Sequence, residues 1–84
     1  MSAVRDVIEV VAKALTDRPD EVSVVESQHR GQTLVELYVG TGELGRVIGK
    51  QGRTAAALRT LAATAGEKEG KTVTLEIRDG KPSL

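Results

Sequence analysis

The sequence predicts a small α+β domain whose helices and strands follow one another in the order α-β-β-α-α-β. Apolar residues recur at helical spacing over residues 4–15 and 54–65, and they alternate with polar residues in short segments that indicate strands. A chain of 84 residues is long enough for one small domain, and without cysteine it has no disulfides.

The first helix is predicted by apolar residues three and four positions apart. These are Val4, Val7, Ile8, Val11, Ala14 and Leu15. Ser2 stands where an N-cap is expected. Pro19 disfavours helical backbone at Arg18, so we expect this helix to end near residues 16–17.

A β-hairpin should follow the first helix. Clustered valines indicate a strand over residues 21–28, and strict alternation of apolar residues indicates a second strand over residues 33–39. Residues 29–32, which include Gly31, supply the turn between them.

The second half of the chain should contain two helices and one strand. A short helix is expected over residues 43–48, and a longer one follows with an apolar stripe over residues 54–65. We expect Gly66 to end the longer helix.

The final strand is predicted by alternation over residues 72–78, after a charged loop at residues 67–71. We expect a single domain over residues 1–79 and a frayed tail at residues 80–84.

The formal net charge is zero, but the charges are unevenly distributed. Residues 1–45 carry a net charge of −4 and residues 46–84 a net charge of +4. Between Arg46 and Gly66 there are four bases and no acid. A basic face of this kind attracts phosphate, although an ordinary solvated helix surface gives the same pattern.

A glycine motif lies inside this basic segment, in the run Gly-Arg-Val-Ile-Gly-Lys-Gln-Gly-Arg at residues 45–53. Gly49 and Gly52 allow a sharp turn and a close approach of a ligand to the backbone. The helix that follows begins with free N–H groups, which favour an anion. A phosphate-bearing partner is therefore the first hypothesis.

Glycine spacing alone does not identify that partner. Residues 40–45 satisfy the dinucleotide pattern, but the next helix is interrupted at Gly49, and Glu43 places a carboxylate where a phosphate would lie. The run over residues 45–51 is one residue short of an NTPase phosphate loop, and Gln51 replaces its Mg²⁺-binding hydroxyl. Nucleotide cofactors are therefore disfavoured, and we expect none.

The composition also argues against an enzyme. His29 is the only histidine, and no residues show the spacing of a metal site, so neither a nucleophile nor a metal is expected. Tyr38 is the only aromatic residue, which disfavours RNA-binding folds that stack bases on several aromatic side chains. We interpret the chain as a binding module.

The run at residues 45–54, together with Leu58 and the order of elements, resembles the signature of KH domains of type II. The length and the segment from Arg46 to Arg59 are similar to the small bacterial stand-alone KH proteins of the KhpA type. This resemblance implies a three-stranded sheet covered on one face by three helices, and single-stranded RNA as the partner. Ala55 departs from the pattern, since many KH domains have a large aliphatic residue there.

The resemblance also implies roles for individual residues. The backbone at Gly49 and Gly52 is expected to clamp RNA phosphates, with Lys50 and Gln51 projecting into the sugar–phosphate path. The RNA-binding set is completed by two arginines, Arg46 and Arg53. Val47 and Ile48 are expected in the core, and either one is also a candidate for lining a base groove.

A second contact is expected on the longer helix, which is apolar or small over most of its circumference. The candidate dimer interface is Leu58, Leu61 and Ala62, although high helix propensity alone also explains the alanines. The resemblance implies a homodimer, and a heterodimer with a larger KH-containing protein (KhpB, also called Jag or EloR). It further implies an RNA chaperone linked to cell elongation and envelope homeostasis.

Two other interpretations remain open at this stage. The chain is alternatively a dimerisation subunit whose partner supplies the RNA contact, or a ribosome-associated factor. No apolar run approaches the length of a membrane span, and residues 1–15 do not fit a signal peptide, so we expect a cytoplasmic protein.

Overall fold

The computed structural model describes residues 2–82 and contains the six expected elements in the expected order. The elements are α1 (Ala3–Leu15), β1 (Ser23–His29), β2 (Gln32–Val39), α2 (Leu44–Ile48), α3 (Arg53–Lys68) and β3 (Val73–Asp79), with short 3-10 turns at Pro19–Glu21 and Lys50–Gly52. β1 begins two residues later than predicted because the chain after Pro19 first makes one of these turns.

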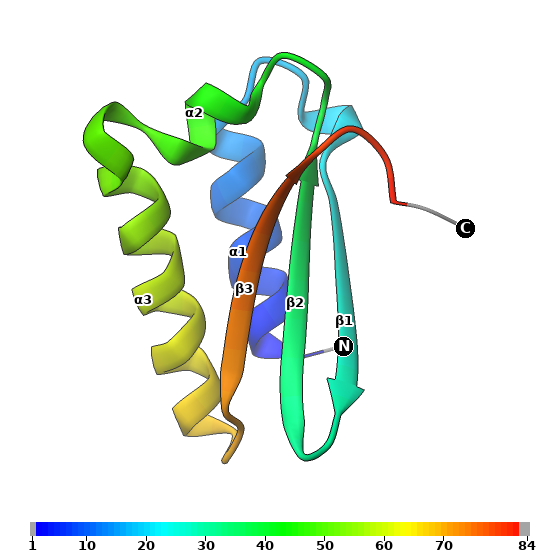
Figure 1. The fold of residues 1–84 in the computed structure, drawn as a ribbon, viewed down its shortest axis with the longest axis vertical. Coiled ribbons are helices and arrows are strands. Elements are labelled where there is room, and N and C mark those ends of the chain that lie inside the picture. The colour runs from blue at the N-terminus through cyan, green and yellow to red at the C-terminus, as the bar shows by residue number, and fades with distance from the viewer. Residues whose placement is uncertain (1, 83–84) are drawn as a thin grey trace.

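The three strands form one sheet in the order β1-β2-β3, with β2 in the centre. β1 and β2 are an antiparallel hairpin, whereas β2 and β3 run parallel, with Thr33 opposite Val73 and Val39 opposite Asp79. The helices pack on one face of this sheet, and the opposite face is left uncovered (Figure 1). The α+β architecture predicted from the sequence is confirmed.

The core lies between the sheet and the helices. Alternate residues of β2 point into it, and α1 and α3 contribute residues one turn apart. Its fully or almost fully buried members include Val35, Leu37 and Val39 from β2, Val4, Ile8 and Ala12 from α1, and Leu58 and Ala62 from α3. The two long helices are thereby fixed side by side, and α2 is held near one end of the sheet.

The prediction that Gly66 ends the long helix is wrong. α3 continues through Gly66 to Lys68, and Gly66 is buried. A Cβ there would overlap the Val73 side chain and lie 3.1 Å from the Lys71 carbonyl oxygen. Gly66 is therefore needed for close packing of α3 against the start of β3, which helical spacing cannot reveal.

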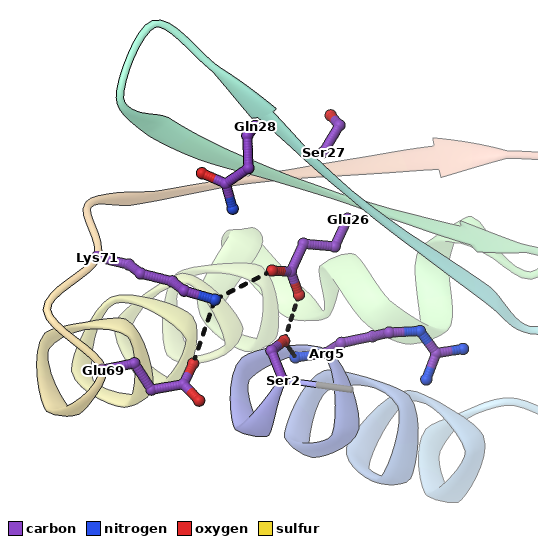
Figure 2. A pocket seen from close by; sticks show the side chains of 7 residues that line it. All are labelled: Ser2, Arg5, Glu26, Ser27, Gln28, Glu69 and Lys71. Carbon is purple, nitrogen blue, oxygen red and sulfur yellow. Dashed lines mark hydrogen bonds and ion pairs between the residues drawn. The ribbon is translucent and has the colours of Figure 1, made fainter.

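The start of α1 is fastened by polar side chains at the opposite end of the molecule from the Gly49–Gly52 loop (Figures 1 and 2). The Ser2 hydroxyl accepts a hydrogen bond from the Arg5 N–H and donates one to Glu26 on β1. Lys71 lies 3.3 Å from the same Glu26 carboxylate and 3.8 Å from Glu69. The predicted N-cap is confirmed, and it also joins α1 to the sheet.

These contacts change the acidity of Glu26. The hydrogen bond from Ser2 and the neighbouring Lys71 ammonium favour the carboxylate and lower its pKa below the ordinary value of 4.5. A carboxyl group with a lowered pKa in the folded state stabilises the fold above about pH 4.5, and this contribution is lost as the pH falls through the folded-state pKa.

We predict that Gly66→Ala destabilises the protein although alanine is the better helix former. The added methyl group overlaps Val73, and overpacking of this kind costs about 1–3 kcal/mol. Gly45→Ala is the matched control, because the added methyl meets no atom within 4 Å beyond its chain neighbours and the backbone of its own helix, and α2 should gain from alanine. Thermal unfolding of both variants measures the difference, and equal melting temperatures would contradict the packing role.

We also predict that Glu26→Gln lowers the free energy of unfolding at pH 7 by about 1–2 kcal/mol, because the charged hydrogen-bond acceptor is lost. The gap between variant and wild type should narrow as the pH falls below 4.5 through the folded-state pKa of Glu26. Denaturant titrations across this range give the measurement. A gap that stays constant down to pH 2 would show that the carboxylate charge contributes nothing.

Candidate nucleic-acid interface

The connection between α2 and α3 is a tight turn in which three of four residues have positive φ. Gly49 ends α2 with φ 75° and ψ 174°, and its N–H donates to the Gly45 carbonyl oxygen at 2.9 Å. Gln51 has φ 58°, and Gly52, at φ 73°, directly precedes the first residue of α3. The loop thus reverses the chain within four residues.

The two loop glycines are required for different reasons. A Cβ on Gly49 would overlap the Thr54 hydroxyl and lie 2.7 Å from the Thr54 Cβ, so the loop is packed against α3 at this point. A Cβ on Gly52 would meet no atom within 4 Å beyond those of its two chain neighbours. Gly52 therefore serves backbone conformation alone and leaves open space beside the main chain.

Polar side chains surround that open space. Lys50, Gln51 and Arg53 are exposed, and the Arg53 guanidinium donates to the Gln51 side-chain oxygen at 3.1 Å. Among residues 2–82 no carboxylate pairs with Lys50 or Arg53. The 16-residue α3 begins here without a side-chain cap or an acidic residue in its first turn. The Arg53 N–H donates to the Lys50 carbonyl oxygen within the turn. The positive end of the α3 dipole and the charges of Lys50 and Arg53 therefore converge on the loop.

Arg46 differs from the other predicted RNA-binding residues. Its Nη2 lies 2.6 Å from Asp17 Oδ2, and its Nε lies 3.9 Å from Glu43 Oε2. The stretch after Arg46 is free of acids in the sequence, but the fold brings two carboxylates to it from earlier in the chain. Only part of the predicted basic cluster is therefore unpaired.

Glu43 is a residue whose role the sequence reasoning missed. Its side chain is only 8% exposed, and its Oε1 accepts hydrogen bonds from the backbone N–H groups of Asp17 at 2.6 Å and Arg18 at 3.1 Å. Glu43 thereby ties the start of α2 to the chain that leaves α1. These partners lie 26 and 25 positions away, so no local spacing signals the contact.

The two candidates for the base groove differ in burial. Val47 is fully buried in the core, so its assignment to an RNA groove is corrected. Ile48 is half-buried at the end of α2 and keeps a surface next to the loop. Ala55 is buried, with 3% exposure.

The three candidates for the dimer interface also differ in burial. Leu58 and Ala62 are each 1% exposed and pack into the core of their own chain, so they offer no surface to a second copy, and that part of the prediction is corrected. Leu61 is 42% exposed. Val10 on α1, which the sequence reasoning did not select, is 68% exposed and belongs to the helix that packs beside α3.

Other kinds of site find little support. Across residues 2–82, no three His, Asp or Glu side chains are grouped so that they would hold a metal ion. In the same part of the chain, no helix combines the length and apolar character needed to cross a membrane. The hollow of about 510 Å³ drawn in Figure 2 is lined by Glu26, Glu69 and Lys71, whose charges already pair with one another.

Comparison with known proteins places the chain among small bacterial proteins of similar length. Residues 5–77 match the family model described as KhpA/KhpB, KH domain. The RNA-binding protein KhpA of Aquifex aeolicus is 51% identical over 77 residues, which cover 92% of this chain and 98% of that protein. Those of Caldanaerobacter subterraneus and Clostridium acetobutylicum are 46% and 45% identical, over 86% and 87% of this chain and 96% and 97% of theirs.

Proposed function

The chain belongs to the KhpA/KhpB family of KH domains, and from this we propose that it binds single-stranded RNA through the loop Gly49–Gly52. The expectation of a binding module rather than an enzyme agrees with this family. The relatives described above are named RNA-binding proteins, and we infer the same activity for this chain.

The observation that carries the proposal is the open backbone beside Gly52, next to the unpaired side chains of Lys50 and Arg53. A loop of this kind in KH domains clamps the backbone of about four nucleotides. The positive end of the α3 dipole adds attraction for a phosphate, and Gln51 adds an uncharged polar group. The half-buried Ile48 is the remaining candidate for contact with a base.

Such a loop should bind weakly on its own. Contact with two or three phosphates gives a change in log K of only about −1.4 to −2.1 per tenfold increase in salt. Two loops acting together would raise the effective affinity without a new contact. We therefore propose that the protein acts as a dimer.

The exposed apolar residues of the helical layer support dimerisation. Leu61 and Val10 are the two large hydrophobic side chains in residues 2–82 that are strongly exposed, and they lie on the neighbouring helices α3 and α1. We propose that these residues pair two copies of the chain, or pair it with a larger KH-containing protein of the KhpB type. This surface also supports the second candidate, a dimerisation subunit whose partner supplies the RNA contact.

The cellular role is the broadest part of the proposal and rests on the family resemblance. We propose a cytoplasmic RNA chaperone that contributes to cell elongation and envelope homeostasis. The domain comprises residues 1–79 in this proposal, and the tail expected at residues 80–84 lies partly outside the described residues.

We predict that replacing both Lys50 and Gln51 with aspartate abolishes binding to a labelled single-stranded RNA oligonucleotide, because two carboxylates then face the phosphates. Anisotropy titrations measure the loss, which should exceed tenfold. Thermal stability should be unchanged, because both side chains are exposed.

The matched control replaces Arg30 and Gln32 with aspartate. One basic residue and one glutamine are again replaced, so the same charge change falls on the exposed hairpin, at the opposite end of the sheet from the loop (Figure 1). The control should bind RNA nearly as well as the wild type. Equal losses in both variants would attribute binding to net charge and would count against a clamp at the loop.

For the interface, we predict that Leu61→Asp converts a dimer into a folded monomer in sedimentation velocity experiments. The side chain is exposed, so the aspartate is solvated in the monomer but would be buried in the dimer at a high energetic cost. Ala63→Asp is the control, since this exposed residue lies about 200° round the helix from Leu61. A dimer that persists in both Leu61→Asp and Val10→Asp would exclude the helical face as the interface.

A further inference from the structure

The pairing of Arg46 with two carboxylates has a consequence for RNA affinity. Arg46 lies on α2, one turn before Gly49, and its guanidinium is held 2.6 Å from Asp17 and 3.9 Å from Glu43. A carboxylate and a phosphate bind the same guanidinium donors, so both cannot fully occupy this side chain.

We propose that Asp17 is an affinity-determining residue that competes with RNA phosphate for Arg46, and that Glu43 is the positioning residue that holds Arg46 beside the loop. This inference rests on the proposed function, because it assigns a role in the same RNA contact. A phosphate must displace Asp17 to bind Arg46, whereas no carboxylate of residues 2–82 pairs with Lys50 or Arg53.

The burial of the two carboxylates differs, and this difference separates their roles. The side chains of Asp17 and Arg46 are 64% and 55% exposed, so their ion pair is solvated and easily exchanged. The Glu43 side chain is 8% exposed, and both backbone N–H groups that donate hydrogen bonds to it belong to the segment after α1. Glu43 therefore stays in place when the Asp17 contact is released.

Backbone contacts hold Arg46 in the same position. The Arg46 N–H donates to the Glu43 carbonyl oxygen at 2.9 Å, which fixes the first turn of α2. The Gly49 N–H then donates to the Gly45 carbonyl oxygen at 2.9 Å. Arg46 thus lies on the short helix that leads directly into the loop, and release of Asp17 would leave its guanidinium close to the proposed path of the RNA backbone.

Exchange of Asp17 for a phosphate has a distinctive salt dependence. In the wild type, the RNA phosphate loses a counterion when it binds Arg46, and the displaced Asp17 carboxylate binds a cation from solution. The exchange therefore releases no net counterion. When Asp17 is replaced by asparagine, the guanidinium keeps only its longer 3.9 Å contact with Glu43. Its phosphate contact should then steepen the slope of log K against log salt by up to about 0.7.

The experiment measures binding of a labelled single-stranded RNA oligonucleotide to Asp17→Asn at several salt concentrations. We expect about two- to fivefold tighter binding at about 0.1 M salt, the factor by which an exposed ion pair stabilises its partners, together with the steeper slope. Glu67→Gln is the control for net charge, because this exposed carboxylate lies near the far end of α3, about 21 Å along the helix from Arg53. It should leave both quantities unchanged.

A double-mutant cycle tests whether Asp17 acts through Arg46. The gain from Asp17→Asn should disappear when Arg46→Gln is also present. A gain that persists without Arg46, or a wild-type slope and affinity in Asp17→Asn, would overturn the proposal. Unfolding curves of all variants confirm that the fold is retained.

The variant with aspartate at both Lys50 and Gln51 separates this proposal from the one on which it rests. One outcome is that the wild type and Asp17→Asn bind RNA equally well and the loop variant does not bind. The loop clamp is then supported, and the proposed role of Asp17 is wrong. If the wild type binds no better than the loop variant, both proposals fail together.

Discussion

Parallel pairing of β2 with β3 is the constraint on which the position of the site depends. Two parallel neighbours cannot be joined by a tight turn, so the chain must return along the sheet between Val39 and Val73. α3 makes this return, because 16 residues of helix span about 24 Å and seven residues of strand span about 23 Å. The loop before α3 therefore lies at the end where β2 finishes, with the helix N-terminus at the surface.

The loop combines a fixed side and an open side because its glycines serve different purposes. At Gly49 the missing side chain lets the backbone approach Thr54, so α2 and α3 are locked together at the turn. At Gly52 the missing side chain leaves the backbone accessible and permits the left-handed conformation that starts α3. A ligand that meets this loop finds a backbone already ordered by hydrogen bonds within the turn, so little conformational entropy is lost on binding.

Much of the fold was predictable from the sequence, because helices and strands impose periods on their apolar residues. The N-cap at Ser2 and the loop motif are local, and spacing reveals them. The errors lie where distant segments meet: Gly66 packs against Val73, and Glu43 accepts from the chain after α1. The sequence of one helix also does not show which of its apolar residues are buried in the core of the same chain. For that reason the exposed Leu61 could not be distinguished from its buried neighbours.

The acidic half of the chain has a direct effect on the basic half, since Asp17 and Glu43 reach Arg46 across the fold. The loop is left with few unpaired charges, so a single domain can neutralise few phosphates, and its affinity depends on how many domains act together. Leu61 lies about 12 Å along α3 from Arg53, and a contact through Leu61 would leave the loop uncovered. In the proposed dimer, this distance would leave both loops accessible to RNA.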